Sequence, residues 1–252
     1  MGEVEHYAAS GVLVAIRLSG LMIFAPVFNS SAIAPRIKAG FIFALTILLA
    51  PVVGEVTGAR AVIDAQSVMG ELGVGLVFGL GLMVLTEMLM MAGTLLGMSF
   101  SFSLVNLLDP NTMIETPVLG QLLGWIGVLV IVGAGLDRVL LASLVRSFRV
   151  VPLGEAVLGA RSGIVLAKMC SQIFLGGLQL AAPVMAAGLA VEMTISMVSR
   201  LAPMLPVQVI GIPLKTLTSY VVLIASLAIW PGWIEHHFTS LLDQAGSMLV
   251  QR

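Results

Sequence analysis

Long stretches without charged side chains constrain this 252-residue sequence more than any other feature. The stretch from Leu72 to Leu108 has 37 residues and a single charge, Glu87. Charged residues make up 10% of the whole chain, against about 25% in ordinary soluble domains. The sequence therefore predicts a helical, membrane-associated protein. Its other apolar segments are Gly11–Phe28, Ala39–Val53, Thr116–Leu136, Met169–Val191 and Thr216–Ile234.

Composition excludes several classes of protein. Hydrophobic residues make up 59% of the chain, so an intrinsically disordered protein and a soluble globular enzyme are excluded. Twelve basic residues oppose thirteen acidic ones, which excludes the strongly basic face of a nucleic-acid-binding protein. The single cysteine, Cys170, cannot form an internal disulfide. The N-terminal residues lack a basic region, so we expect no cleaved signal peptide.

The apolar segments do not match a simple bundle of membrane spans. A spanning helix needs about 20 residues, and Ala39–Val53 has only 15. As a helix, Leu72–Leu108 would be about 55 Å long, which is too long for one span and too short for two spans with a turn. Because no turn signal lies near Glu87, we expect a long helix that extends beyond the bilayer plane, or a broken one. Longer loops are expected at Gly54–Glu71 and Arg146–Lys168.

The end of the chain has the pattern of an amphipathic helix. Apolar residues recur there at spacings of three and four, which places them on one face of a helix. Two interpretations remain open: this face lies against a membrane or a partner, or it packs on the rest of the same chain. The apolar residues are Phe238, Leu241, Leu242, Ala245, Met248 and Leu249.

No arrangement of residues suggests catalysis. We find no zinc-ligand spacing, phosphate-binding loop or nucleophile elbow, so we expect neither an enzyme nor a cofactor. Two charges, Arg17 and Glu87, lie deep in apolar segments, and such residues are candidates for function. The simpler interpretation for Arg17 is interhelical pairing or bonding to backbone carbonyls. For Glu87 it is a solvated or paired position on a helix outside lipid.

The segment from Glu87 to Pro117 is the most informative part of the sequence. Methionine and phenylalanine alternate there with small residues that let helices approach closely, and methionine adapts to irregular surfaces. A polar turn, Asn106–Asn111, then precedes a proline that can begin the next helix. Two interpretations remain open: core packing with a hairpin turn, or an adaptable apolar collar and a loop that close a pore. The collar candidates are Met88, Met90, Met91, Met98, Phe100 and Phe102.

Several motifs in order resemble the FliR family of flagellar type III export-gate proteins, which has a counterpart in virulence injectisomes. The first motifs are Arg17–Phe28 (RLSGLMIFAPVF), Ala34–Gly40 (APRIKAG) and Leu49–Pro51 (LAP). The central ones are Gly97–Pro110 (GMSFSFSLVNLLDP), Pro117–Gln121 (PVLGQ) and Ser147–Gly154 (SFRVVPLG). The last are Ser199–Pro203 (SRLAP) and Gly211–Lys215 (GIPLK). The resemblance extends from about residue 12 to residue 235 and leans towards the flagellar members. The sequence departs from the family pattern at Gly135–Arg138, where members often carry a Gly-His-His-like patch.

The resemblance implies an all-α gate subunit that consists of helical hairpins and long kinked helices. Residues up to about 155 would resemble FliP, and residues from about 156 to 252 would resemble a FliQ hairpin followed by the C-terminal amphipathic helix. FliP and FliQ would be partners in one pore, FlhB and FlhA would be further partners, and unfolded flagellar proteins would be the substrates. The location would be the bacterial inner membrane, at the flagellar basal body. A central loop would plug the lumen, and it would contain Asn106, Leu107, Leu108, Asp109, Pro110, Asn111, Thr112, Met113, Ile114 and Pro117.

One other class of function remains an alternative. The chain could be a secondary transporter or a small channel subunit with Arg17 and Glu87 on the solute path. Transporters often have paired broken helices in two related halves, and no such pairing is evident in this sequence.

Overall fold

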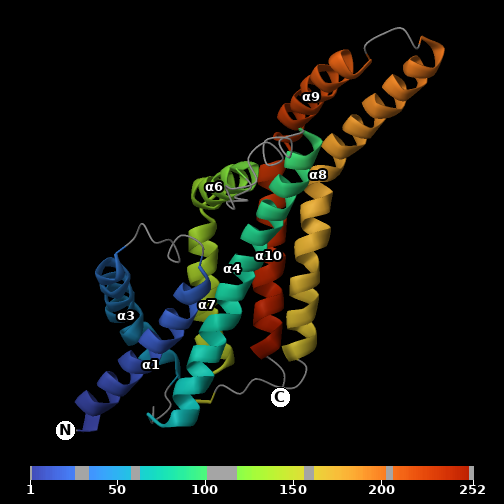
Figure 1. The fold of residues 1–252 in the computed structure, drawn as a ribbon. Helices are drawn as coiled ribbons and strands as arrows, with labels where there is room; N and C mark the ends of the chain where they lie inside the picture. The colour runs from blue at the N-terminus through green and yellow to red at the C-terminus, as the bar shows by residue number, and fades with distance from the viewer. Residues whose placement is uncertain are drawn as a thin grey trace, which may run out of the picture. The chain divides into compact units, whose positions relative to one another are not determined.

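Helices are the regular secondary structure of the described part of the chain. A computed structural model describes residues 2–25, 34–57, 63–100, 118–155, 162–202 and 207–249. These residues form eight α-helices and no strand, which confirms the expected all-α class (Figure 1). The helices are α1 (Gly2–Phe24), α3 (Pro35–Thr57), α4 (Ala65–Ser99), α6 (Val118–Gly133), α7 (Leu136–Val150), α8 (Ser162–Leu201), α9 (Val207–Ser226) and α10 (Trp230–Leu249).

Four of the described helices are long and apolar enough to cross a membrane, namely α3, α4, α8 and α9. A fifth span is possible if α6 and α7 count as one broken span, because they meet at a bend of 73°. The first apolar segment, in α1, is shorter than a span. The protein is therefore membrane-associated, as expected, and its apolar helices are as uneven as the sequence indicated.

The long apolar stretch around Glu87 forms one unbroken helix. Helix α4 has 35 residues, so it is about 52 Å long, well beyond a hydrocarbon core of about 30 Å. The expected absence of a turn near Glu87 is confirmed, and of the two possibilities the long helix is the one observed. Helix α8 is longer still, with 40 residues, and continues through Pro183.

The structure corrects three expected boundaries. The loop expected at Gly54–Glu71 is shorter, because α4 begins at Ala65, where the Asp64 carboxylate accepts a 2.8 Å hydrogen bond from the Ser67 amide and caps the helix. Helix α7 likewise continues to Val150 and α8 begins at Ser162, within the loop expected at Arg146–Lys168. The apolar segment Thr216–Ile234 is divided between α9 and α10 by a turn at residues 227–229.

The helices form two compact units, which we describe separately. Unit 1 comprises residues 1–85, 131–170 and 236–252, and contains α1, α3, α7 and parts of α4, α8 and α10. The apolar face of α10 is buried in it, so this helix packs on its own chain, which decides between the two interpretations of the C-terminal pattern. Core residues of unit 1 include Leu13, Val14, Leu18, Val74, Phe78, Leu144, Phe148, Met169, Phe238, Leu241, Ala245 and Met248.

Glycines allow α1 and α4 to touch backbone to backbone in unit 1. A Cβ atom at Gly75 would lie 2.0 Å from the carbonyl oxygen of Arg17, and one at Gly20 would lie 2.6 Å from that of Leu72. No real Cβ atom tolerates such distances, so the crossing requires glycine. Because Gly75 is one turn beyond Glu71, this crossing also brings the side chain of Arg17 beside Glu71.

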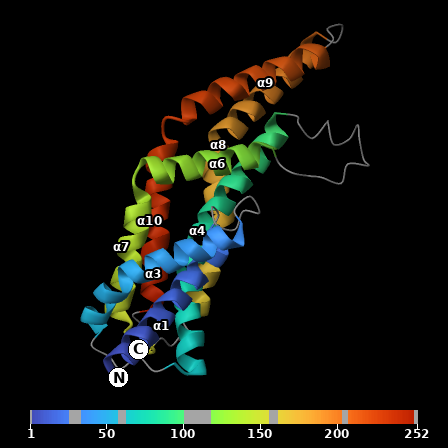
Figure 2. The same cartoon turned by 90° about the vertical axis from the view of Figure 1, so that its left-hand side faces the viewer.

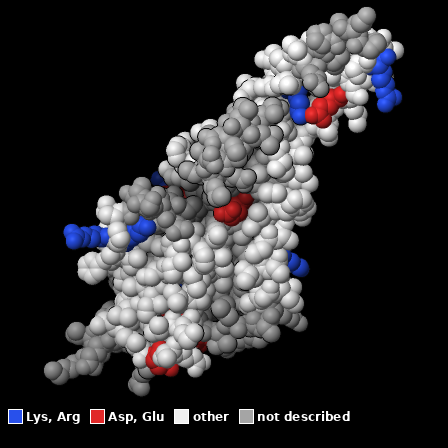
Figure 3. All heavy atoms as spheres, viewed as in Figure 1, with Lys and Arg blue, Asp and Glu red and all other residues white. Residues whose placement is uncertain are grey.

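Unit 2 comprises residues 86–130 and 171–235. In it, α9 runs along the second half of α8 (Figure 2), and an ion pair between Lys215 and Glu192 joins these helices. Large apolar side chains are exposed over this hairpin, and only 11% of the span in α9 is buried. In unit 1 the span in α3 is only 6% buried. Figure 3 shows few charged side chains on the face that it presents.

Candidate functional site

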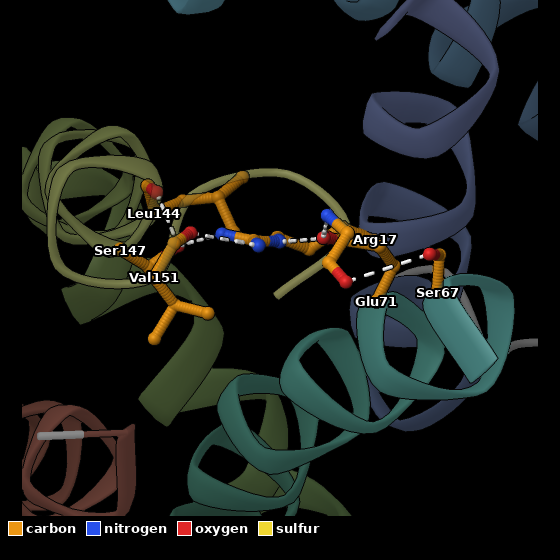
Figure 4. A network of polar contacts seen from close by, with 7 residues as sticks. Arg17, Ser67, Glu71, Leu144, Ser147 and Val151 are labelled. Carbon is orange, nitrogen blue, oxygen red and sulfur yellow. Dashed lines mark hydrogen bonds and ion pairs between the residues drawn. The ribbon is translucent and has the colours of Figure 1, made fainter. Parts of the chain in front are cut away.

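A buried arginine organises the polar contacts of unit 1. Arg17 on α1 is completely buried, and its guanidinium group makes three hydrogen bonds to other elements (Figure 4). Its Nε donates to Glu71 Oε2 at 2.5 Å, and its Nη1 donates to Ser147 Oγ at 3.0 Å. Its Nη2 donates to the carbonyl oxygen of Val151 at 3.2 Å. One side chain thus joins α1 to α4, to α7 and to the turn after α7.

Glu71 extends this network to the same turn. Its second carboxylate oxygen, Oε1, accepts a 3.0 Å hydrogen bond from the amide of Gly154. Gly154 has φ +83°, a left-handed conformation that disfavours a side chain. The carbonyl oxygen of Gly154 accepts a hydrogen bond from Ser67 Oγ at 3.4 Å. The turn over residues 151–154 is therefore held at both of its ends by side chains of α1 and α4.

Although Arg17 is buried, its guanidinium group has hydrogen-bond partners. The ring of Phe148 lies 4.0 Å from its Cζ atom, an arrangement that stabilises a cation over an aromatic face. A buried charge is tolerated only when it is paired and hydrogen-bonded, and Arg17 meets both conditions. Of the two interpretations of Arg17, the structure supports interhelical pairing together with carbonyl bonding. It does not support a position on a solute path, because solvent does not reach the group.

Glu87 differs from Arg17. It is partly exposed on α4, sixteen residues beyond Glu71, and it has no ion pair among the described residues. Among the described residues, no hydrogen bond or ion pair joins Glu87 to Arg17. Nor do any three His, Cys, Asp or Glu side chains within the described ranges gather closely enough to hold a metal ion.

Sequence reasoning missed three members of the network around Arg17. Glu71 was assigned to a loop, and neither Ser147 nor Gly154 has a chemically distinctive pattern around it. A signal was nevertheless available, because the family-like motif Ser147–Gly154 contains both residues and the carbonyl of Val151. The buried network supplies a physical reason for that motif.

The collar candidates separate into packed and exposed residues. Met88 is completely buried, and its Sδ lies 2.8 Å from where a Cβ at Gly176 would be. The side chain of Met91 lies equally close to Gly177, 2.8 Å from where a Cβ would be. These two methionines therefore pack on α8 within unit 2. Met90 is half-buried, whereas Met98, near the end of α4, is 62% exposed.

The predicted plug residues, Asn106 to Pro117, lie outside the described residues, as does Phe102. The helices that flank residues 101–117 can be described. A Cβ at Gly93 on α4 would lie 2.2 Å from the Cα of Gly120 on α6, so the two backbones touch there. Phe100 is buried and its ring lies 4.5 Å from that of Tyr220 on α9. The two helices that flank residues 101–117 therefore touch at Gly93 and Gly120 in unit 2.

Comparison with known proteins decides the family. The model of the bacterial export proteins, family 1, matches residues 8–241 of the chain. This chain belongs to that family. The matched region begins within α1 and ends within α10, so it includes residues of both units. The expected resemblance to FliR is thereby confirmed.

Members of the family with similar sequences share one name, flagellar biosynthetic protein FliR. The protein from Pectobacterium carotovorum is 26% identical over 237 residues, which cover 94% of this chain and 91% of the relative. The protein from Bacillus subtilis is 26% identical over 256 residues, which cover 99% and 98%. The protein from Escherichia coli is also 26% identical, over 94% of this chain and 91% of the relative. The similarity therefore extends along the whole length of both chains.

Proposed function

We propose that this chain is a subunit of the flagellar type III export gate and lies in the bacterial inner membrane at the basal body. With FliP and FliQ chains it forms a narrow pore through which unfolded flagellar proteins leave the cytoplasm. FlhB and FlhA are further neighbours in the same apparatus. The chain contributes no catalysis; the proposed mechanism is steric, because a central loop closes the lumen at rest.

The observation that carries this proposal is that apolar helices of the chain leave much of their surface unburied. Only 6% of the apolar span in α3 and 11% of that in α9 is buried, against 61% of that in α4. Lipid can cover such surfaces, and so can other subunits. Helices of about 52 and 60 Å are longer than the bilayer core, so part of their surface needs protein neighbours. This favours an assembly of several chains.

The plug assignment has independent support from the flanking helices. Seventeen residues, 101–117, connect Phe100 to Val118, and the contact of Gly93 with Gly120 keeps their helices together. The proposed plug would therefore connect two helices that are packed against each other. Met98 is exposed on the last turn of α4, directly before that loop, which suits a residue of an adaptable collar.

The proposed division near residue 155 agrees with where helices begin. Helix α8 starts at Ser162, and together with α9 it makes a long hairpin joined by the Lys215–Glu192 pair. Such a hairpin is what the FliQ-like part would supply. Residues up to Glu155 would then supply the FliP-like part.

The test is co-expression with the FliP and FliQ proteins of the same bacterium. The expected result is a stable complex far larger than one chain, whereas a monomer or a homodimer would contradict the gate. Deleting Asn111–Ile114 in that complex should raise ion leak across the membrane while the complex persists, because a tight apolar closure resists ions. Arg36→Ala, an exposed change on α3, is the control. Unchanged conductance would refute the plug but not the gate.

A further inference from the structure

Six large apolar side chains share one exposed side of helix α3. They are between 43% and 67% exposed, and with 3.6 residues per turn they spread over about 180° of the helix circumference. The other side of α3 packs on α1, where Thr46 lies beside Gly11, and Leu49 and Val53 are buried there. We call the exposed side the outer face of α3. It consists of Ile37, Phe41, Phe43, Ile47, Leu48 and Val52.

The length of α3 matches the thickness of a bilayer. Its apolar span, Pro35–Val53, has 19 residues and is about 28 Å long, close to a hydrocarbon core of about 30 Å. The segment Ala39–Val53 is too short by itself, but the helix extends beyond it at both ends. Helices α4 and α8 are longer than the core, so part of their surface needs protein neighbours. The apolar span of α3 has no such excess.

The charged residues of α3 lie near its ends. Arg36 and Lys38 precede an uncharged run that continues to Gly54, and Glu55 follows this run. A bilayer is apolar in its middle and polar on both sides, and its anionic headgroups attract basic side chains. The charges along α3 are therefore distributed as the layers of a bilayer require.

The width of the outer face favours lipid over one neighbouring helix. A packed helix meets its neighbour along a seam narrower than about 100°, so it would leave much of the outer face uncovered. The exposed pair Gly40 and Ala44, one turn apart on this side, is where such a helix would approach most closely. Water is a poor occupant, because the exposed surface is apolar and contiguous. Acyl chains are fluid and can cover the whole width.

We propose that the outer face of α3 is covered by the acyl chains of membrane phospholipids. Unit 1 then meets the bilayer through this helix, with Arg36 and Lys38 towards one headgroup layer and Glu55 towards the other. The inference goes beyond the proposed function and does not depend on it, because it concerns only what covers α3.

The first test measures what surrounds a nitroxide label on the outer face. Cys170, the single cysteine, is replaced by serine, and cysteines introduced at positions 37, 41, 43, 48 and 52 are labelled in turn. The purified complex is reconstituted into vesicles of phosphatidylethanolamine and phosphatidylglycerol. Oxygen collides with labels in lipid, whereas a nickel chelate collides with labels in water. The ratio of oxygen to nickel collisions should be several-fold higher at position 43 than at positions 37 and 52, because position 43 is near the middle of the span.

Two results of this experiment would overturn the proposal. Labels that neither oxygen nor nickel reaches would mean that a second chain covers the outer face. Labels that nickel reaches as readily as oxygen would mean that water covers it. Thr46→Cys is the matched control on the same helix, since this position faces α1 and both reagents should be excluded from it.

The second test asks whether a helix of another chain lies on Gly40 and Ala44. A photoreactive amino acid replaces Ala44 in living cells that contain the whole apparatus. The expected product is an adduct with phospholipid, identified by mass spectrometry, whereas an adduct with a second protein chain, or no adduct, would overturn the proposal. The same replacement at Asp243, which is exposed on α10, should give no phospholipid adduct, because a charged side chain is costly among acyl chains.

The two proposals fail in different ways. If the chain forms no complex with FliP and FliQ, the proposed function fails, and labels on the reconstituted chain alone still report what covers α3. If the complex forms but its labels on the outer face are shielded from both reagents, the lipid assignment is wrong and the gate stands.

Discussion

The guanidinium of Arg17 and the carboxylate of Glu71 meet at 2.5 Å in an ion pair that solvent reaches from neither side. The pair joins two helices that cross at Gly75, and it continues to the turn at Val151 and Gly154. A buried pair adds little net stability compared with apolar side chains of the same shape, but losing one partner is costly. The pair and its hydrogen bonds therefore help to fix the relative positions of α1, α4 and α7.

Arg17→Met should destabilise the chain by about 3–5 kcal/mol, because it leaves Glu71 buried without its cation. Glu71→Gln should also destabilise it, since a neutral amide cannot balance the guanidinium. Thermal unfolding of the purified chain in detergent measures both changes. Arg36→Met, at an exposed site on α3, should have little effect.

The double variant Arg17→Met with Glu71→Leu separates pairing from burial. It should recover much of the stability that either single variant loses, because no unpaired charge remains inside. If its loss equals the sum of the losses of Arg17→Met and Glu71→Leu measured singly, the two residues do not act as a pair. The amide of Gly154 would still lack its acceptor, so full recovery is not expected.

Gly75→Ala should destabilise unit 1 by about 1–3 kcal/mol or more, because the added methyl group meets the Arg17 carbonyl and must push α1 away from α4. Gly40→Ala is the matched control, since a Cβ there meets nothing within 4 Å on α3. The control should be neutral or stabilising by about 0.5–1 kcal/mol. Equal effects of the two changes on the unfolding temperature would contradict the close crossing.

Met88 and Met98 should respond differently to the same change. Met88→Ala removes a fully buried side chain that fills the gap at Gly176, so it should cost about 2–5 kcal/mol of stability. Met98→Ala should cost little, because Met98 is largely exposed. In an assembled gate, however, Met98→Ala should raise ion leak if the residue contributes to the collar. An equal loss of stability in both variants would refute this division of roles.

The Lys215–Glu192 pair should matter far less than the buried pair. Half of the Glu192 side chain is exposed, so solvent screens the interaction and Glu192→Gln should change stability by about 1 kcal/mol or less. The measurement is the unfolding temperature of Glu192→Gln, compared with that of Glu71→Gln under the same conditions. A loss as large as that of Glu71→Gln would mean that the hairpin depends on this charge.

Several features of the fold could be read from the sequence. The charge-free run around Glu87 predicted either a long helix or a broken one, because no turn signal interrupts it, and α4 is continuous there. The apolar spacing from Phe238 to Met248 predicted the face of α10, since helical periodicity is a local property. Family membership also followed from ordered motifs such as Ser147–Gly154.

Other features could not be read in this way. The sequence left open whether the apolar face of α10 packs on its own chain or on a membrane or partner. It also took Thr216–Ile234 as one segment, because the start of α10 lies inside an apolar run. It also placed Glu71 in a loop. The residues that Arg17 contacts are 54 and 130 positions away, and no local pattern specifies such partners.

By itself, then, the sequence determined the helical, membrane-associated class, because composition and periodicity act locally along the chain. Its ordered motifs also resembled those of the family. Only the tertiary structure decided that Arg17 is a packed and paired residue, that Met88 lies inside and Met98 outside, and that six large apolar side chains share one exposed side of α3. These outcomes depend on where distant helices meet. The meeting points are set by close contacts such as that of Gly75 with the backbone of Arg17, which only the folded chain brings together.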